Sequence, residues 1–476
     1  MSSSERIAAY NELLLRAMQS ALGYLAALPD RPPLVPDCDG ELRQLMGGAL
    51  PASPAAPQDV LELLLQGADL GICPSGSGRY FGYVAGGILP VALAADWLTS
   101  VWDQACSVYE LSPLTSVLED ICRQWLVDLF GLPDGTSVSF TPACTYASLL
   151  GLAAARHKVL ADRGWDVATA GMNGAPSVTV LVNETIHASV LRCLHILGLG
   201  GGIRELATDG QGRITPQALA RGLREAAGAP LIVCGHVGEV NTGAVDDLRQ
   251  LGRGVHLAGG WLHLDAAFGM WAAATSRRHT LLHGLDLADS WATDAHKWLN
   301  VPYDSGIALI ADADAHRAAL ATAPDYLNHR DAQHRHPMQW ELGFARRSRV
   351  IPVWAALRQL GKDGVAQLVD RHCALARRLA AHLAAEPGVH IANEVVLNQV
   401  AVWFEHPSRD RDSDTHTRQV AEAFQRQGAA WASTSRWNGH AVLRLSIVNW
   451  VTTGEDIDRA AGSLIACHRS LIQGRA

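Results

Sequence analysis

The sequence predicts an α/β protein with a mainly parallel central sheet and helices on both faces, and three observations point to it. Between about residues 137 and 312, short β-rich runs alternate with helix-like stretches. The chain has 476 residues, 48% of them hydrophobic, and a mean hydropathy of +0.06, which is a globular composition. After about residue 350 the pattern changes to long Ala/Leu/Arg-rich helices. We therefore expect a large sheet domain followed by a smaller C-terminal α/β domain.

The β-rich runs are short, and helix-sized intervals separate them. The runs span 137–140, 178–182, 230–234, 262–264 and 306–310, and the helix-like stretches span 145–162, 187–197, 216–227 and 245–252. In the last third of the chain, 399–404 and 441–448 are the strand candidates. Parallel strands joined by helices end at one edge of their sheet, so residues that follow these runs are candidates for a ligand site.

The N-terminal segment predicts an amphipathic helix. Apolar residues recur at helical spacing from Ile7 to Leu28, and Pro29 ends the pattern. Such a helix packs either on its own chain or on a second subunit, and its residues alone favour neither. Further on, Ser116 to Glu119 reads as a capping box before a helix that Gly131 ends. We expect three units: a helical arm over 1–80, a large domain over 81–350 and a small domain over 351–476.

The composition argues against several classes of protein. A net charge of −8 disfavours a general nucleic-acid binder, and no apolar run is long enough to span a membrane. The first 30 residues lack a signal-peptide pattern. The nine cysteines form no CxxC pair, which favours a reducing cytoplasm over a disulfide framework or zinc site. The glycines at 198–202 lack the last glycine of GxGxxG and follow a helix, so we reject a dinucleotide site.

A lysine motif carries the first candidate for chemistry. It reads Asp294-Ala-His296-Lys297-Trp298. A lysine in a partly desolvated site loses its proton readily and can then attack an aldehyde carbon. A neighbouring histidine and aspartate can bind or orient an anionic group of the same ligand. A His-Lys pair alone is a weak signal, because most lysines are simply solvated.

An aspartate at a strand end is the second candidate. Asp265 follows the run 262–264, and the small residues Ala266 and Ala267 come directly after it. A carboxylate at this edge can pair with a protonated ring nitrogen, and a small residue lets a flat ring lie close to the backbone. The alternative is an ordinary helix cap or buried salt bridge. Lys297 lies 32 residues after Asp265, which leaves room for one crossover and one strand.

Two further positions fit an anionic, flat ligand. Ala143, Cys144 and Thr145 stand where a strand passes into a helix, and the N–H groups of a helix N-terminus attract phosphate. His187 can stack on a flat ring and reach a substrate carboxylate. Taken alone, an ordinary strand–turn–helix junction and a core histidine are the simpler interpretations.

In this order and spacing the motifs resemble the amino-acid decarboxylases that depend on pyridoxal 5′-phosphate (PLP), the family of the aromatic-L-amino-acid and glutamate decarboxylases. The resemblance covers nearly the whole chain. It rests on the lysine motif together with Arg79-Tyr80-Phe81-Gly82-Tyr83, the turn from Gly238 to Asp246, Ala345-Arg346-Arg347 and Leu443-Arg444-Leu445-Ser446. It implies a fold type I enzyme with a seven-stranded-type central sheet, and a homodimer with intertwined N-terminal arms.

The resemblance also implies a role for each candidate. Lys297 is then the lysine that binds PLP as a Schiff base, and Asp265 is the partner of the pyridinium nitrogen. His187 stacks on one face of the ring and Ala267 lies beneath the other. The residues at the phosphate-binding positions are then Ala143, Cys144, Thr145 and His296, with Asp294 at the nearby polar position. The implied reaction releases carbon dioxide and an amine through a quinonoid intermediate.

One departure from the family leaves the outcome of the reaction open. Decarboxylating relatives usually carry a proton-donating tyrosine in a catalytic loop, here expected at about 324–343, and the equivalent place near Pro337 has none. Tyr326 matches an earlier, structural tyrosine of the family, while His329, His334 and His336 are candidate acids or simply a solvated, His-rich loop.

Without that tyrosine, an oxygen-dependent oxidative deaminase that forms an aldehyde stays an alternative. An aminotransferase or a non-catalytic scaffold is less favoured. The segment 80–87, expected to line the substrate pocket, is rich in glycine and identifies no substrate.

Overall fold

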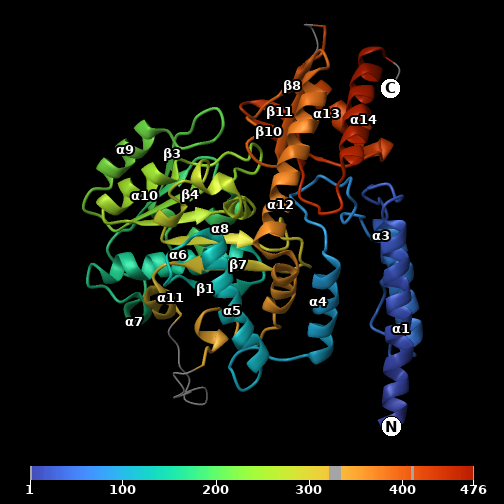
Figure 1. Ribbon diagram of the computed structural model, residues 1–476, viewed down its shortest axis with the longest axis horizontal. Helices are drawn as coiled ribbons and strands as arrows, with labels where there is room; N and C mark the ends of the chain where they lie inside the picture. The colour runs from blue at the N-terminus through green and yellow to red at the C-terminus, as the bar shows by residue number, and fades with distance from the viewer. Residues whose placement is uncertain (1–2, 321–333, 409–411, 475–476) are drawn as a thin grey trace.

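The computed structural model describes residues 3–320, 334–408 and 412–474. A seven-stranded sheet forms the centre of the protein, and a four-stranded sheet lies in its C-terminal part (Figure 1). The strands of the large sheet are β1 (Ser137–Thr141), β2 (Thr179–Asn183), β3 (Ile203–Leu206), β4 (Leu231–His236), β5 (Trp261–Asp265), β6 (Ser290–Asp294) and β7 (Gly306–Ile310). Those of the small sheet are β8 (Val389–Ile391), β9 (Gln399–Phe404), β10 (Ser433–Trp437) and β11 (His440–Ser446).

The helices follow the order that the sequence pattern predicts between strands. The α-helices are α1 (Ser3–Ala27), α2 (Asp39–Met46), α3 (Pro57–Gly71), α4 (Pro90–Trp102), α5 (Pro113–Phe130), α6 (Cys144–Ala161), α7 (Val167–Ala170), α8 (Ala188–Ile196), α9 (Pro216–Glu225), α10 (Leu248–Leu257), α11 (Ala313–Ala319), α12 (Val350–Ala384), α13 (Ser413–Gln427) and α14 (Gly454–Ile472). The short 3-10 helices are η1 (Gly200–Gly202), η2 (Gly269–Ala274), η3 (Ser276–His279), η4 (Leu285–Leu287) and η6 (Pro337–Gln339).

The large sheet is mainly parallel, as the alternating pattern predicts. Its strand order is β1-β7-β6-β5-β4-β2-β3, and only β7 runs antiparallel to its neighbours. All five predicted runs are strands of this sheet. The runs missed β3, a short edge strand with exposed charged residues, and β6, whose polar Ser290, Thr293 and Asp294 hide a fully buried strand.

Both faces of the sheet are covered by helices. Successive strand residues alternate between two cores, because side chains of a strand point to opposite faces in turn. Val180 and Val182 face the core built with α6 and α8, whereas Leu181 faces the core built with α5, α9, α10 and the start of α12. The predicted two-sided α/β architecture is therefore confirmed, and it buries every residue of β5 and β6.

The small sheet is antiparallel, in the order β10-β11-β9-β8. Two of its strands match the predicted runs 399–404 and 441–448, and α13 and α14 complete a core around Phe404 and Phe424. The long helix α12 leads from the large sheet to this part and is broken at Gly361, where φ is +61°. The expected boundaries at residues 80 and 350 remain a prediction.

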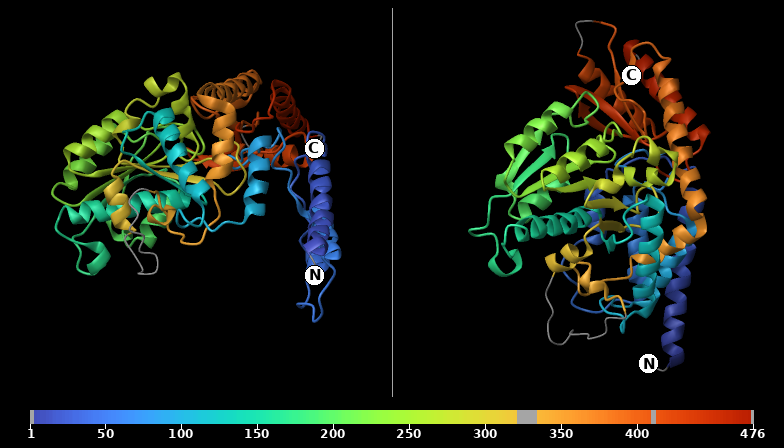
Figure 2. Two further views of the ribbon diagram at one scale, coloured as in Figure 1. Left: turned by 60° about the horizontal axis from the view of Figure 1, so that its bottom comes forward. Right: turned by 60° about the vertical axis from the view of Figure 1, so that its left-hand side comes forward.

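The N-terminal helix projects from the rest of the chain. Figures 1 and 2 show α1 side by side with α3, away from both sheets. Arg16 joins the two helices by an ion pair with Glu62, but most of the apolar stripe of α1 faces solvent. The exposed fractions of Tyr10, Leu14 and Leu22 are 68%, 54% and 57%.

The predicted capping box at Ser116 is wrong. Helix α5 already begins at Pro113, with Ser112 as its N-cap, because proline is pre-organised for the first helical position. Ser116 and Glu119 lie buried within the helix, where Glu119 binds Arg335 and Arg346. The predicted end is correct, since Gly131 adopts the left-handed conformation of a C-cap, with φ +66°.

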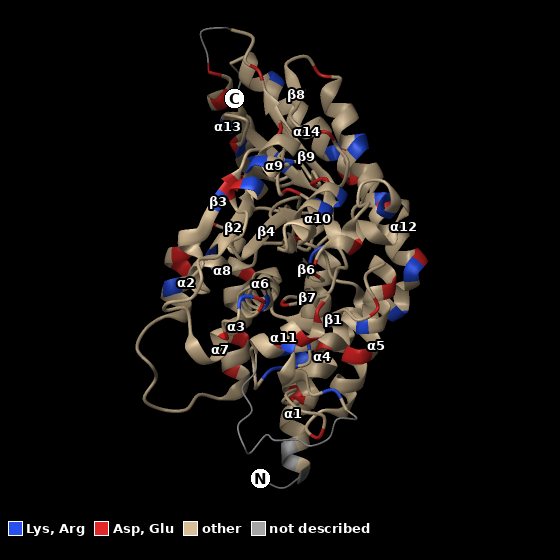
Figure 3. Cartoon of the chain, turned by 90° about the vertical axis from the view of Figure 1, so that its left-hand side faces the viewer, with Lys and Arg blue, Asp and Glu red and all other residues tan. Residues whose placement is uncertain are grey.

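The charged side chains are spread over the molecule. Figure 3 shows Lys and Arg interspersed with Asp and Glu on the visible elements, with no continuous stripe of one sign. Within the described residues, no helix has the length and apolar character needed to cross a membrane.

Candidate active site

Two aspartates meet on the same face of the sheet, at its carboxyl edge. Asp265 ends β5 and Asp294 ends β6, and these strands are parallel neighbours. Trp261 of β5 and Ala292 of β6 belong to the core that α6 covers. Because side chains alternate between the two faces of a strand, Asp265, four residues after Trp261, and Asp294, two residues after Ala292, point to the same side, towards α6. They are 7% and 2% exposed, respectively.

Lys297 lies directly against one of these carboxylates. The turn after β6 carries it, and its Nζ lies 3.0 Å from Asp294 Oδ2. Burial opposes the charge of the amine, but Asp294, Cys144 and Asp265 outweigh it and raise the pKa of Lys297 above its ordinary value. The two groups therefore form a charged pair until a ligand replaces one of them.

The first residue of α6 touches both aspartates. The backbone N–H of Cys144 donates to Asp294 Oδ1 over 2.6 Å, and its Sγ lies 3.6 Å from Asp265 Oδ1. The N–H of Ala267 donates to the same oxygen of Asp265 over 3.2 Å. The structure thus brings the predicted phosphate junction, the predicted ring partner and the predicted lysine together within one cluster.

His296 is a buried, neutral member of the cluster. Its Nδ1 accepts a hydrogen bond from the N–H of Ser305, which leaves the ring proton on Nε2, 3.7 Å from Asp294 Oδ1. Burial lowers the pKa of His296 below its ordinary value, with Asp294 opposing the shift. Its ring also packs against Tyr303, with 4.2 Å between the centroids.

Close backbone contacts surround the lysine and the phosphate junction. A Cβ atom on Gly306 of β7 would lie 2.4 Å from the carbonyl carbon of Ala143, and one on Gly86 would lie 2.2 Å from the carbonyl oxygen of Lys297. Gly86 therefore serves close packing against the lysine turn. In the same segment, Tyr83 and Val84 have φ of +52° and +57°, strained values for residues with side chains.

Asn300 holds the lysine turn to the rest of the protein, and no sequence motif pointed to it. Its Oδ1 accepts from the N–H groups of Gly87 and Trp450, and its Nδ2 donates to the carbonyl groups of Trp298 and Val448. The side chain is fully buried. It links the segments before and after the sheet to the turn of Lys297, a connection that exists only in the folded chain.

His187 lies at the same edge of the sheet but outside this cluster. It is the exposed N-cap of α8, the helix that follows β2, and its Nδ1 lies 2.7 Å from Ser189 Oγ. Helix α8 contacts α6, because Cys193 Sγ of α8 donates a hydrogen bond to the carbonyl oxygen of Thr145 on α6 over 3.2 Å. In the described chain, His187 makes no hydrogen bond to Lys297, Asp265 or Asp294.

The expected catalytic loop is described only in part, since Tyr326 and His329 lie outside the described residues. His334 stacks on Tyr109 with 3.8 Å between the centroids, and His336 is 2% exposed. The interpretation as a solvated loop is therefore wrong for His336, whose side chain is buried and whose Nδ1 accepts a hydrogen bond from the N–H of Tyr109. Pro337, near which the resemblance leads us to expect a tyrosine, begins η6 and is buried.

Arg444 is a buried cation near the segment 80–87. It lies on β11 and is 8% exposed; its guanidinium makes no hydrogen bond to the described residues, and its Nε is buried without a partner. Burial lowers the pKa of its guanidinium, and the charges that oppose this shift are those of Glu239 and Tyr83. A buried guanidinium is costly without an anion, which marks it as a candidate group for binding a carboxylate.

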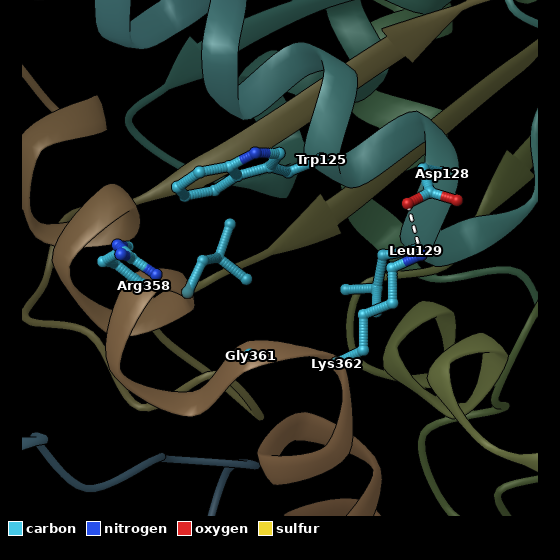
Figure 4. Close-up of a pocket in the computed structure, with 7 residues that line it drawn as sticks. Trp125, Asp128, Leu129, Arg358, Gly361 and Lys362 are labelled. Atoms are coloured by element: carbon cyan, nitrogen blue, oxygen red, sulfur yellow. Dashed lines mark ion pairs between the residues drawn. The ribbon is translucent and has the colours of Figure 1, made fainter.

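A cavity of about 280 Å³ lies elsewhere, between α5 and the break in α12 (Figure 4). Trp125, Leu129, Leu357 and Arg358 line it, and an ion pair between Lys362 and Asp128 closes one side. It shares no lining residue with the Lys297 cluster, and none of its groups supplies a nucleophile beside a base.

The residues of the cluster fit PLP. An amine for the aldehyde, a buried carboxylate at a strand end for the ring nitrogen and a helix N-terminus for the phosphate all lie at one edge of the sheet. The backbone of β7 approaches Ala143 closely at this helix N-terminus, which is possible only because residue 306 is glycine. This fold and this set of groups define a PLP-dependent enzyme of fold type I.

Comparison with known proteins identifies the family. The model of the pyridoxal-dependent decarboxylase conserved domain matches residues 40–405. The chain is 24% identical to phenylacetaldehyde synthase of Arabidopsis thaliana, covering 93% of this chain and 92% of that protein. It is 26% identical to aromatic-L-amino-acid decarboxylase of Bacillus atrophaeus, covering 87% and 86%. The chain therefore belongs to the PLP-dependent decarboxylases, which are carboxy-lyases.

A solved structure gives the same fold. The Oryza sativa TDC structure with PLP and tryptamine superposes with a TM-score of 0.90 over 99% of each chain, at 19% sequence identity. The Rhodiola rosea 4-hydroxyphenylacetaldehyde synthase superposes with a TM-score of 0.86 over 99% of each chain, at 20% identity. The predicted fold class and cofactor are thus confirmed, whereas the roles of single residues remain predictions.

Proposed function

We propose that this protein is an L-amino-acid decarboxylase that releases carbon dioxide and an amine, with Lys297 as the residue that binds PLP covalently. The observation that carries the proposal is the contact of Lys297 with Asp294 beside Asp265, at the N-terminus of α6. Bound PLP supplies an electron-accepting ring that makes loss of the substrate carboxylate possible. The protein must bind the ring, direct one bond of the substrate and control one proton.

The cluster divides these tasks among its residues. Asp294 holds the proton of Lys297 at Nζ, and the amine becomes a nucleophile when that proton is removed. Asp265 binds the ring nitrogen and keeps it protonated. The N–H groups of Ala143 and Thr145, with His296 donating from Nε2, would bind the phosphate, and the N–H of Cys144 would join them only when Asp294 releases it. Ala267 leaves room for the ring on one side, and His187 covers the other.

Arg444 is the group that we propose for the substrate carboxylate. It is buried, its guanidinium lacks a hydrogen-bonding partner among the described residues, and it lies near Tyr83 of the strained segment beside Lys297. A guanidinium binds a carboxylate in a bidentate manner and so fixes the direction of the bond to be broken.

Formation of an aldehyde is the second candidate. Its support is Pro337, which stands where relatives that make amines carry a proton-donating tyrosine, together with the similarity to two aldehyde synthases. A site without that acid protonates the substrate carbon slowly, which leaves time for reaction with oxygen. The second candidate would then consume one oxygen and one water per amino acid and yield carbon dioxide, an aldehyde, ammonia and hydrogen peroxide.

Product analysis separates the two candidates. The holoenzyme is incubated with single L-amino acids, with and without oxygen, and amine, aldehyde and peroxide are measured by mass spectrometry and a peroxidase-coupled assay. We expect one amine per carbon dioxide in both atmospheres. Aldehyde formed in equal amount with peroxide, and only in the presence of oxygen, would refute the amine product and support the second candidate. Retention of the carboxylate would refute both.

We also propose a homodimer in the cytoplasm. The exposed apolar stripe of α1, which includes Tyr10, Leu14 and Leu22, supports packing of the arm on a second copy of the chain. Light scattering should give twice the chain mass of 50.9 kDa. Removal of residues 1–30 should shift the protein towards the monomer, and an unchanged mass would contradict the role of the arm.

A further inference from the structure

Cys144 makes two different contacts with the two carboxylates beside Lys297. Its backbone N–H binds Asp294 Oδ1 over 2.6 Å, and its Sγ lies 3.6 Å from Asp265 Oδ1. The residue is 6% exposed and begins α6, so both contacts come from a fixed point of the fold.

The thiol of Cys144 is a hydrogen-bond donor at neutral pH. Burial and the negative charges of Asp265 and Asp294 raise its pKa well above the ordinary value of a cysteine. A protonated thiol is a weak donor, and a bond to a charged acceptor is stronger than one to a neutral acceptor. The direction is fixed by chemistry, since a carboxylate of Asp265 only accepts.

These contacts leave one oxygen of each carboxylate for the reactive groups. On Asp294, Oδ1 is held by Cys144 and Oδ2 lies 3.0 Å from Lys297 Nζ. On Asp265, Oδ1 is held by Cys144 and by the N–H of Ala267, while Oδ2 makes no hydrogen bond within the described chain. The free oxygen of Asp265 is therefore the one available to a ring nitrogen.

We propose that Cys144 is a positioning residue whose thiol orients Asp265, so that Oδ2 of this aspartate faces the ring nitrogen of PLP. The proposal rests on the proposed role of Asp265 as the ring partner. It gives the thiol a task of its own, separate from the backbone donors that the helix N-terminus offers to the phosphate. The N–H of Ala267 shares the task, so loss of the thiol should weaken the orientation of Asp265 without abolishing it.

The test compares two cofactors in the absence of substrate. Apoenzyme is titrated with PLP and with the analogue in which a CH group replaces the ring nitrogen, and the dissociation constants are measured by absorbance and intrinsic fluorescence. The variants are Cys144→Ala and Cys144→Val, which lack the donor, and Cys144→Ser, which keeps one. Cys373→Ala, a buried thiol on α12 outside the cluster, is the matched control.

We expect Cys144→Ala to weaken PLP binding by about tenfold, because it removes a hydrogen bond to a charged group. Binding of the analogue should change by less than about twofold, since Asp265 has no ring nitrogen to meet there. Cys144→Ser should restore most of the PLP affinity, and Cys144→Val should repeat the loss although its side chain fills the space of the thiol. Equal losses for both cofactors, or no loss for PLP, would overturn the proposal. The proposed decarboxylase function is tested separately, by the amine that the unaltered enzyme forms, so failure of the Cys144 proposal would not count against it.

Discussion

The amine of Lys297 and the carboxylate of Asp294 lie 3.0 Å apart, three residues from each other on the turn that follows β6. The carboxylate raises the pKa of the lysine even though burial opposes the charge. The same aspartate accepts a hydrogen bond from the first residue of α6. The charge of the proposed nucleophile is thus set by a residue that also holds the proposed phosphate site in place.

Replacement of Asp294 should change the pH at which PLP attaches. In Asp294→Asn the lysine loses its closest negative charge, so its pKa falls, and burial lowers it further. The neutral, nucleophilic amine then exists at lower pH, and the midpoint of the pH–rate profile for covalent attachment should move down by about one unit. The profile is measured by the absorbance of lysine-bound PLP after mixing with apoenzyme. An unchanged midpoint would show that Asp294 does not control the lysine.

Lys297→Ala should abolish covalent attachment of the cofactor. The variant keeps Asp265, Asp294 and the N-terminus of α6, so it should still bind PLP non-covalently and keep its circular dichroism spectrum. Reduction with borohydride followed by mass spectrometry should find PLP linked to the unaltered chain and none linked to the variant. A reduced adduct of the same mass in Lys297→Ala would refute the assignment.

Gly86→Ala should disturb the lysine turn from outside it. A Cβ atom at this position would lie 2.2 Å from the carbonyl oxygen of Lys297, so one of the two backbones must move. We expect the affinity for PLP to fall by at least about tenfold, measured by titration of the apoenzyme, since such overpacking costs about 1–3 kcal/mol. Gly135→Ala is the matched control, because a Cβ atom there meets no atom within 4 Å. Similar affinities in both variants would contradict the packing role of Gly86.

Glu119→Gln should lower the stability of the fold. Glu119 is fully buried and pairs with Arg335 and Arg346, so the neutral side chain would leave two buried cations without their nearest anion. We expect a loss of about 3–5 kcal/mol in the free energy of unfolding, measured in urea. Asp128→Asn is the control, because its pair with Lys362 lies at the surface and should contribute at most about 1 kcal/mol.

The difference between Glu119→Gln and the unaltered chain should depend on pH. Burial opposes the charge of Glu119, but Arg346 and Arg335 outweigh it and lower the pKa of this carboxyl below its ordinary value of 4.5. The stabilisation is therefore fully present above pH 4.5 and is lost as the pH falls through the lower, folded-state pKa. The two proteins should converge in stability in acid and differ at neutral pH, and a constant difference would contradict the ion pair as its cause.

Local patterns predicted the elements that follow from short stretches of sequence. Alternation of apolar runs and helical stretches predicted five of the strands of the large sheet, and the lysine motif marked Lys297. Strands β3 and β6 were missed because exposed charges or polar residues mask their apolar pattern. The capping box at Ser116 failed because a proline three residues earlier starts the helix more strongly than a side-chain cap.

By itself the sequence determined the α/β class, the order of the main elements, the family and the residue types needed for PLP. These follow from periodicity and from motifs whose members are close in the chain or fixed in order. Only the tertiary structure decided which oxygen of Asp265 is free, that Cys144 touches both carboxylates, and that Gly86 and Asn300 pack against the lysine turn. The physical reason is distance along the chain: these contacts join residues up to 213 positions apart, and only the packing of the strands and helices brings them within hydrogen-bonding range.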